Sequence, residues 1–354
     1  MSMELGQIQS FINDENQNKK NIKALAILSG GIDSSLAAKL VSEFGIEVIG
    51  ISFPSPFCIC NMKSSNYECA GLFFAEKIGL PFEMKAKEND YLEILKQQIE
   101  SNPDNVEICI ECKVYIFKKV KEYMQEIGAQ FIITGEILGS KPNPKTIDLL
   151  MKIDKMARVE GLVLRPFSAS YLPETIPERE GWVNRQTLLE MQGKIPNIKY
   201  SPGKKVSSIR NFCSSEGCLV IEKNFAPIMQ DYLKHSSNPN MQEVELLKIG
   251  THFRFKGVKL VHSESAGFKN IIECNKQRGY LLSFHQNQKG VIRYVYVDPT
   301  DDIEIMEFAE QLCAFYPKVF SKEEEIQRVD LSGEKASLQK KITNNKIKFK
   351  KYKL

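Results

Sequence analysis

The chain has 354 residues, of which 42% are hydrophobic and 26% charged, values typical of a soluble globular protein with room for two cores. No apolar run approaches the roughly 20 residues of a membrane-spanning helix, and the polar residues 1–20 contain no apolar signal core, so the sequence predicts a cytoplasmic protein with no membrane partner. The net charge of +4 is weakly basic, and the nine cysteines are not expected to form disulfides in a reducing compartment.

A glycine turn between an apolar run and a helical pattern is the most informative feature of the first half. Residues 24–28 predict a strand buried on both faces, and apolar residues recur at helical spacing over 36–41. Between them, small residues leave room for a ligand near the backbone, and polar residues occupy the first helical turn. These residues are Ser29, Gly30, Gly31, Asp33, Ser34 and Ser35. Because a helix N-terminus attracts anions, this segment predicts a site for phosphate or pyrophosphate.

The elements that follow alternate between strands and helices, which predicts a parallel sheet. Residues 47–53 read as the second strand, and Ser52 and Phe53 fall at its carboxyl end, where ligands of such sheets bind. Further strands are expected over 81–85, over 129–134 and within 163–169, helices over 69–78, 90–99, 115–127 and 146–157, and a proline-rich loop over 172–182.

The central cysteines, Cys109 and Cys112, directly precede the helix predicted for 115–127. There the helix dipole and the following Lys113 lower the pKa of a thiol. This placement favours a nucleophile, a persulfide carrier or a metal-thiolate pair, while a redox pair and simple packing remain alternatives.

Two more cysteine groups flank the central pair. The earlier group is Cys58, Cys60 and Cys69. It could bind zinc or an iron-sulfur cluster, but C-x-C is not the usual metal spacing, and burial as small apolar residues is the alternative. Cys213 and Cys218 surround a glycine turn and could complete a site begun by the central pair, a meeting in space that one sequence does not establish.

The order Ser-Gly-Gly-x-Asp-Ser-Ser in residues 29–35 resembles the PP-loop of the N-type ATP pyrophosphatases. Those enzymes cleave ATP between the α and β phosphates and transfer AMP to a substrate oxygen. The resemblance implies that the serines and glycines of the loop hold pyrophosphate and that Asp33 helps to place Mg²⁺. It also implies that adenine is held near Ser52 and Phe53.

Additional motifs, in this order over residues 23–193, sharpen the resemblance: SGGIDSS, C-x-x-C, TGEILGSKP, LRPFSA and LPETIPEREGW. Together they look like the adenylating domain of the tRNA 4-thiouridine synthetases, and the tRNA 2-thiouridylases share the PP-loop and the central cysteines. Ser140-Lys141-Pro142 departs from the glutamine and Ala-Ser of the 4-thiouridine enzymes, and only some 20 residues precede the first strand, where those synthetases carry an RNA-binding domain. These departures leave the modified base and position open.

The resemblance implies an ATP-dependent tRNA sulfurtransferase that adenylates a uridine carbonyl oxygen and replaces it with sulfur, giving 4-thiouridine or 2-thiouridine. Such enzymes pass persulfide sulfur between two distant cysteines or hold a [4Fe-4S] cluster through three. Cys109, Cys112 and one of Cys213 or Cys218 satisfy either scheme, with a slight preference for the cluster. The implied cofactors are ATP and Mg²⁺, and the implied partners are tRNA and a sulfur donor such as a cysteine desulfurase or sulfide.

Charged residues beside the predicted strands are candidates for contacts with these ligands. Gly135 and Glu136 follow the strand over 129–134, which places the carboxylate near the nucleotide or the target base, with a capping role as the alternative. Arg165 and Arg179 are candidates for phosphate contacts.

The second half predicts a β-rich α+β module that resembles the RNA-binding modules of some PP-loop proteins. Short strands are expected between residues 243 and 297, including one over NIIECNK, residues 270–276. A basic strand face for RNA, with a plain solvated face as the alternative, consists of Lys248, His252, Arg254, Lys256 and Lys259. The predicted divisions are a lead over 1–20, the α/β PP-loop domain (adenine nucleotide alpha hydrolase-like) over 21–195, a linker and β-rich module over 196–300, and a helix with a lysine-rich tail over 301–354.

Two other functions fit parts of the sequence. A PP-loop ligase acting on a small molecule would leave the cysteines without a role, and no glutaminase segment is evident to supply ammonia. An RNA-binding or ribosome-associated protein could retain a nucleotide domain that no longer catalyses. Pyrophosphate release that depends on added tRNA distinguishes these functions from tRNA thiolation.

Overall fold

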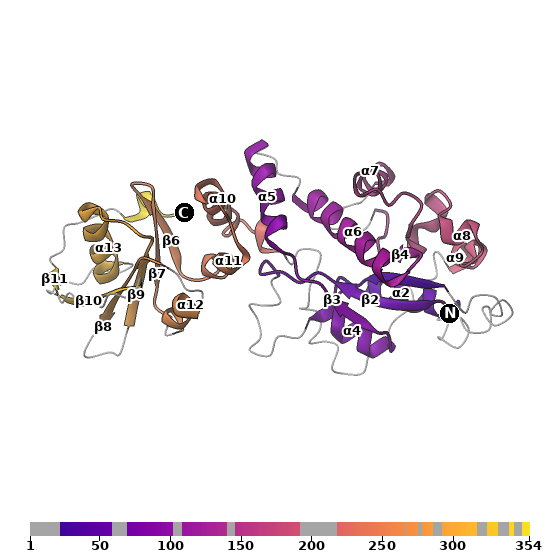
Figure 1. The fold of residues 1–354 in the computed structure, drawn as a ribbon, viewed down its shortest axis with the longest axis horizontal. Coiled ribbons are helices and arrows are strands. Elements are labelled where there is room, and N and C mark those ends of the chain that lie inside the picture. The colour runs from indigo at the N-terminus through magenta and orange to yellow at the C-terminus, as the bar shows by residue number, and fades with distance from the viewer. Residues whose placement is uncertain are drawn as a thin grey trace. The chain divides into compact units, whose positions relative to one another are not determined.

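The computed structural model describes residues 22–58, 69–101, 108–139, 146–191, 218–265, 267–274, 278–285, 292–316, 324–331, 340–342 and 349–354. The chain forms two compact units, residues 1–219 and 220–354 (Figure 1). No helix within the described ranges is long and apolar enough to cross a membrane.

Unit 1 is built on a parallel sheet of five strands in the order β3-β2-β1-β4-β5, which confirms the predicted α/β class. The strands are β1 (Lys23–Ile27), β2 (Glu47–Ser52), β3 (Phe82–Met84), β4 (Phe131–Ile133) and β5 (Val163–Leu164). The helices are α2 (Ile32–Ser42), α4 (Ala70–Ile78), α5 (Asn89–Ser101), α6 (Ile108–Ile127), α7 (Ile147–Ala157), α8 (Ile176–Arg179) and α9 (Arg185–Met191), with the 3₁₀ turn η2 (Pro166–Tyr171). The 3₁₀ turn η5 (Leu219–Ile221) begins at the last residue of unit 1. Strand order places β1 at the centre, so its carboxyl end lies between those of β2 and β4.

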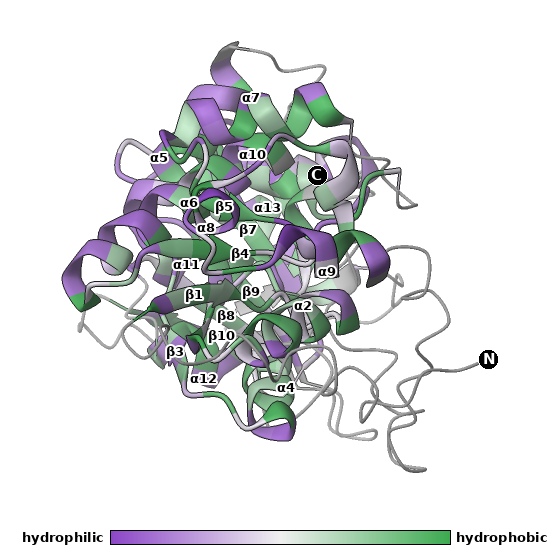
Figure 2. Ribbon diagram, turned by 90° about the vertical axis from the view of Figure 1, so that its right-hand side faces the viewer, coloured by the Kyte–Doolittle hydropathy of each residue, from purple (hydrophilic) through white to green (hydrophobic). Residues whose placement is uncertain are grey.

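Helices cover both faces of this sheet, because alternate residues of the central strand enter different cores. Ala24 and Ala26 pack with residues of α2, whereas Leu25 packs with Val114 and Phe117 of α6. Strand β4, and strand β1 after Lys23 at its start, are correspondingly hydrophobic (Figure 2). A strand buried on both faces reads as a continuous apolar run, which is why the sequence predicted it well.

Unit 2 contains an antiparallel sheet of six strands in the order β11-β10-β8-β9-β7-β6. The strands are β6 (Thr251–Phe255), β7 (Val258–Ser263), β8 (Tyr280–His285), β9 (Ile292–Val297), β10 (Glu324–Asp330) and β11 (Lys340–Ile342). The helices are α10 (Ala226–His235), α11 (Met241–Leu247), α12 (Phe268–Cys274) and α13 (Ile303–Phe315), with the 3₁₀ turn η6 (Phe349–Tyr352). Helix α13 packs into one core of the sheet and α12 into another.

Three segments differ from their predicted form. Residues 270–274, expected as a strand, belong to α12, because Phe268 and Ile272 lie one helical turn apart and are both buried. The loop expected over 172–182 contains the short helix α8, whose start is stabilised by a capping box between Thr175 and Glu178. Residues 301–354, expected as a helix and tail, also contribute β10 and β11 to the sheet.

Candidate functional site

The predicted anion-binding loop connects β1 to α2. Gly30 has a φ of 81°, a backbone conformation that glycine adopts without strain. The Ser34 and Ser35 hydroxyls donate to the Gly31 carbonyl over 2.9 and 3.1 Å, which fixes the loop against the first helical turn. Gly31 is the N-cap of α2 and offers no side-chain cap, so the helix N-terminus suits an external acceptor.

Glycines set the spacing between this loop and its neighbours. A Cβ atom on Gly135, just after β4, would lie 2.3 Å from the Ser34 backbone nitrogen. On the other side, the Ser52 hydroxyl donates to the Leu28 carbonyl, and a Cβ on Gly71 would lie 2.2 Å from Ser52 Oγ. The Ser52 hydroxyl, which was predicted to lie near the adenine, thus donates a hydrogen bond to the residue that follows β1.

Beside Gly135, a row of alternating charges runs from α6 into the core. Glu136 is buried, pairs with Lys113 and accepts from Arg165 Nε over 2.8 Å. Both terminal nitrogens of Arg165 donate to the Asp154 carboxylate over 2.7 Å. Burial works to lower the pKa of Arg165, but Asp154 and Glu136 raise it above its usual value. Arg165, predicted to contact phosphate, is instead the buried counterion of two carboxylates.

A lysine that the sequence analysis overlooked lies among the cysteines. Lys87 follows β3, is 9% exposed, and donates from Nζ to Cys112 Sγ over 3.0 Å. Burial works to lower the pKa of Lys87, but Cys112, and then Cys218 and Cys58, raise it above its usual value. The ammonium also lies 4.5 Å from the centre of the Tyr91 ring. Nothing in a lone lysine of an extended segment predicts this contact, which depends on how α6 packs beside the strand.

Two of those cysteines face each other across a short β-bridge. Cys58 and Cys218 are antiparallel partners, and the Leu219 backbone N–H donates to the Phe57 carbonyl over 2.9 Å. The bridge therefore places Cys218 beside the segment that follows β2, although the two are far apart in sequence. We define the thiol cluster as Cys58, Cys112, Cys218 and Lys87.

The other cysteines predicted as site residues do not belong to the thiol cluster as the structure describes it. Cys69 is the N-cap of α4, and Cys109 lies in the first turn of α6, although its side chain is outside the described residues. Cys60 and Cys213 also lie outside the described residues. Within the part of the chain that the structure describes, no three His, Cys, Asp or Glu side chains are grouped closely enough to hold a metal ion.

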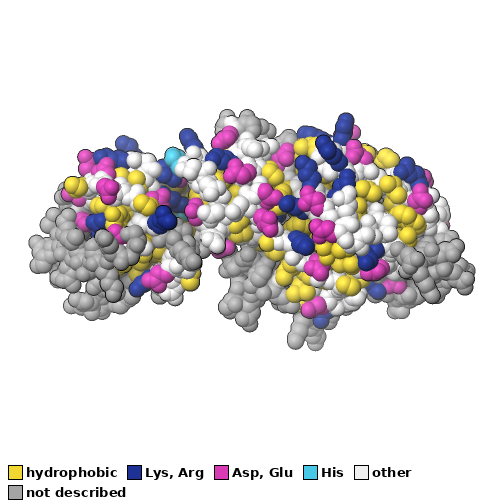
Figure 3. Space-filling model, viewed as in Figure 1, with side chains coloured by type: hydrophobic (Ala, Val, Ile, Leu, Met, Phe, Trp, Pro, Cys, Tyr) yellow, Lys and Arg dark blue, Asp and Glu magenta, His cyan; other side chains and the backbone are white. Residues whose placement is uncertain are grey.

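The basic residues predicted to bind RNA do not form one open face. Arg254 pairs with Asp231, Lys256 with Glu304, and Lys248 with Glu245. His252 and Lys259 are buried. On the face of the molecule seen in Figure 3, lysine and arginine side chains lie among acidic ones. Arg179 is exposed at the end of α8.

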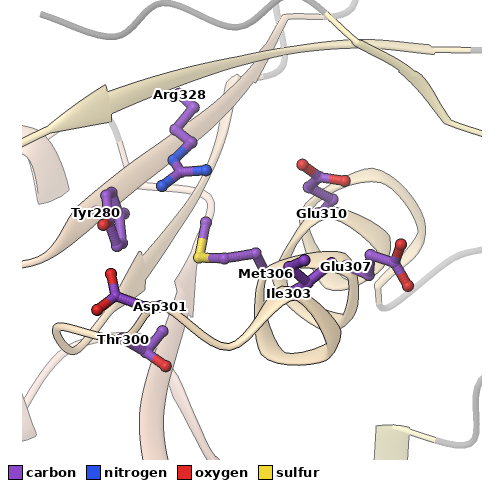
Figure 4. A pocket seen from close by; sticks show the side chains of 8 residues that line it. All are labelled: Tyr280, Thr300, Asp301, Ile303, Met306, Glu307, Glu310 and Arg328. Atoms are coloured by element: carbon purple, nitrogen blue, oxygen red, sulfur yellow. The ribbon is translucent and has the colours of Figure 1, made fainter.

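Unit 2 has a pocket of about 360 Å³ between strands and α13 (Figure 4). The guanidinium of Arg328 lies 4.0 Å from the centre of the Tyr280 ring on one side. Asp301, Glu307 and Glu310 also line the pocket. With three carboxylates and one guanidinium in its lining, this pocket does not suit a phosphate backbone.

Comparisons with known proteins agree with the motifs of unit 1. Residues 20–171 match the family model described as thiamine biosynthesis protein (ThiI). The tRNA-specific 2-thiouridylase MnmA of Paracidovorax citrulli is 22% identical over 289 residues, which cover 76% of this chain and 72% of that protein. This similarity is too long to lie within unit 1 alone.

Two solved structures are also similar. One is a 4-thiouridine synthetase in complex with RNA and bound ATP, at 18% identity and a TM-score of 0.31, with 64% of this chain and 52% of that chain covered. The chain thus spans about half the length of that synthetase. The other is the U34-tRNA thiolase NcsA from Methanococcus maripaludis with its [4Fe-4S] cluster, at 19% identity and a TM-score of 0.27, with 69% and 78% covered.

Proposed function

We propose that this chain, which carries a PP-loop domain related to those of the tRNA thiouridine synthases, is an ATP-dependent tRNA sulfurtransferase. The observation that carries the proposal is the pairing, within unit 1, of a PP-loop with a cluster of thiols around a buried ammonium. The loop supplies adenylation, and the cluster supplies sulfur.

Adenylation requires that a uridine carbonyl oxygen attack the α-phosphorus of ATP while pyrophosphate leaves. The amides at the start of α2, held by Ser34 and Ser35, would bind the leaving pyrophosphate. Asp33, exposed in the first turn of that helix, would help to hold Mg²⁺, which would neutralise charge on the phosphates. Lys113 and Glu136, beside Gly135, would position the nucleotide or the uridine.

Sulfur transfer requires an anionic sulfur that attacks the activated carbon while AMP leaves. Lys87 donates a hydrogen bond to Cys112 Sγ, which stabilises a thiolate or a perthiolate at that position. Cys218 would be the second cysteine, since it shares the same ammonium. We therefore assign Cys112 and Cys218 as the cysteines that carry sulfur.

The thiol cluster suits a persulfide better than an iron-sulfur cluster. Among the residues that the structure describes, no three Cys, His, Asp or Glu side chains are grouped closely enough to hold a metal ion, whereas the Lys87 ammonium donates to Cys112 Sγ and would stabilise an anionic persulfide there. Both observations support the persulfide route rather than the cluster, which the sequence analysis slightly favoured. The proposed substrates are tRNA and ATP, and the proposed sulfur source is a cysteine desulfurase, which supplies sulfur already at the persulfide level.

The test is nucleoside mass spectrometry of tRNA from a strain that lacks its own thiouridine enzymes. Expression of the intact chain should yield 4-thiouridine or 2-thiouridine, and Cys112→Ala should yield neither. Cys274→Ala, an exposed thiol of unit 2, is the matched control and should leave the product level unchanged. Failure of the intact chain to thiolate tRNA, with a cysteine desulfurase present, would overturn the proposal.

A further inference from the structure

The inference concerns Cys58, a thiol that the two-cysteine scheme leaves without a role. Cys58 forms the β-bridge with Cys218, and it lies near the same ammonium as Cys112 and Cys218. The Ser55 hydroxyl lies 3.7 Å from Cys58 Sγ. Both bridged cysteines are half-buried.

The bridge geometry brings these two thiols within reach of each other. The hydrogen bond from Leu219 N to Phe57 O flanks the pair, which makes Cys58 and Cys218 a non-hydrogen-bonded pair of an antiparallel ladder. Cα atoms of such pairs are about 4.5 Å apart. Disulfides span Cα distances of roughly 4.4 to 6.8 Å, so a pair of this kind lies within the range that a disulfide can span.

Electrostatics favours the same bond. Thiolates are the attacking species in thiol-disulfide exchange, and a nearby cation raises the thiolate fraction. Lys87 is a buried cation: burial works to lower its pKa, but Cys112, Cys218 and Cys58 raise it. The ammonium therefore stabilises both an attacking thiolate on Cys58 and an anionic sulfur that leaves.

We propose that Cys58 is the resolving cysteine for Cys218: it displaces hydrosulfide from a persulfide on Cys218 and closes a Cys58–Cys218 disulfide. The step rests on the proposed function, which supplies the persulfide. The Cys58 thiolate attacks the inner sulfur of the persulfide, the sulfur-sulfur bond of the persulfide breaks, and hydrosulfide leaves with its electron pair. The proton lost by Cys58 balances the charge on the hydrosulfide. Cys58 thereby discharges sulfur as sulfide and leaves Cys112 reduced beside Lys87.

The first experiment tests the pairing alone. The full-length protein, freed of reductant, is treated with diamide, which takes one hydrogen from each of two thiols and becomes a hydrazine. Peptide mass spectrometry without reduction should find Cys58 joined to Cys218. A map in which Cys218 is joined to Cys112, or in which Cys58 is joined to a different cysteine, would overturn the proposal.

The second experiment tests the release of sulfide. Sodium tetrasulfide is used to load the thiols of the full chain, and sulfide release is measured after excess reagent is removed. Cys58→Ser should lower the rate at least tenfold, whereas Cys69→Ser, at the N-cap of α4, should not change it. An unchanged rate in Cys58→Ser would contradict the assignment.

The two proposals can fail separately, because neither of these assays contains tRNA or ATP. Disulfide formation and sulfide release without tRNA thiolation would retain the cysteine pair and reject the sulfurtransferase. Thiolation of tRNA at the wild-type level by Cys58→Ser would retain the sulfurtransferase and reject a resolving role for Cys58.

Discussion

Lys87 is buried among sulfur atoms, whereas buried lysines usually pair with carboxylates. Its hydrogen bond to Cys112 Sγ is charge-assisted when the sulfur is ionised. A cation beside a sulfur atom stabilises negative charge on that sulfur. At the scale of single residues, we therefore expect the reactivity of Cys112 to depend on one ammonium group.

Replacing Lys87 by Met should slow the alkylation of Cys112 roughly tenfold at pH 7, because the ammonium that donates a hydrogen bond to its sulfur is removed. The measurement is the rate of iodoacetamide modification of Cys112 as a function of pH, followed by peptide mass spectrometry.

Two variants make this result specific. Lys87→Arg retains the charge and should restore most of the rate. Lys85→Met removes an exposed lysine two residues away and should leave the pH profile unchanged. If Lys87→Met and Lys85→Met had the same profile, the ammonium would have no influence on the thiol.

The charge row beside the PP-loop gives a prediction about stability. Asp154 is 4% exposed and accepts from Arg165, which is 3% exposed, through both oxygens. Asp154→Ala would leave the guanidinium paired with Glu136 but without the carboxylate that accepts from both its terminal nitrogens, and breaking a buried pair in this way typically costs about 3–5 kcal/mol. Urea denaturation of unit 1, followed by far-UV circular dichroism, should show that loss. Asp148→Ala, in the exposed first turn of α7, should cost less than about 1 kcal/mol.

At the scale of elements, the start of α2 can lie close to the end of β4 because Gly135 has no side chain. Gly135 packs against the backbone of Asp33 and Ser34, where a Cβ atom would collide with main-chain atoms that cannot rotate away. The PP-loop is therefore held in place by its neighbouring strand as well as by its own serine hydroxyls.

Gly135→Ala should displace the start of α2 and weaken ATP binding at least tenfold, because the loop amides would no longer converge on the phosphates. Overpacking of this kind also costs about 1–3 kcal/mol of stability. Isothermal titration calorimetry with ATP measures the affinity. The matched control is Gly267→Ala, whose Cβ would meet only Ser265 Oγ at 3.8 Å; equal ATP affinity in both variants would contradict the packing argument.

The sequence predicted those elements whose signals are local. Continuous apolar runs identified β1 and β4, and the glycine-serine turn identified the loop before α2. Helix α12 was missed because a short segment with Ile271 and Ile272 fits either a strand or a helix until its burial is known. Lys87 and Cys58 were not recognised as site partners, because their meeting depends on packing between segments far apart in sequence.

At the scale of the molecule, all four histidines of the chain lie in unit 2, so we expect histidine protonation to affect the stability of that unit. Unit 2 buries His252 and His262, and burial, with Lys259 near the first and Arg293 near the second, lowers their pKa values to about 3 and about 4. Both are neutral in the folded unit at neutral pH, whereas an unfolded histidine takes up a proton below about pH 6.5.

Stability of unit 2 should therefore fall as the pH decreases from about 6.5 towards 4, since the unfolded state binds more protons. The expected slope is about 1.4 kcal/mol per pH unit for each histidine. Thermal unfolding followed by far-UV circular dichroism at several pH values between 7 and 4.5 measures this slope. In the double variant His252→Gln, His262→Gln, stability should depend less steeply on pH than in the wild type. In His235→Gln, at the exposed end of α10, the pH dependence of stability should equal that of the wild type. A double variant as acid-sensitive as the wild type would show that the slope has another source.

The bridge between Cys58 and Cys218 has a practical consequence for dividing the chain into fragments. The motifs alone place the end of the nucleotide domain near residue 195, and a fragment cut there would lack Cys218 and the Leu219 N–H that binds the Phe57 carbonyl. Such a fragment would keep the whole parallel sheet and the PP-loop, yet it would retain only two of the three sulfur atoms around Lys87. The shortest piece that preserves the thiol cluster ends at Leu219, where unit 1 also ends.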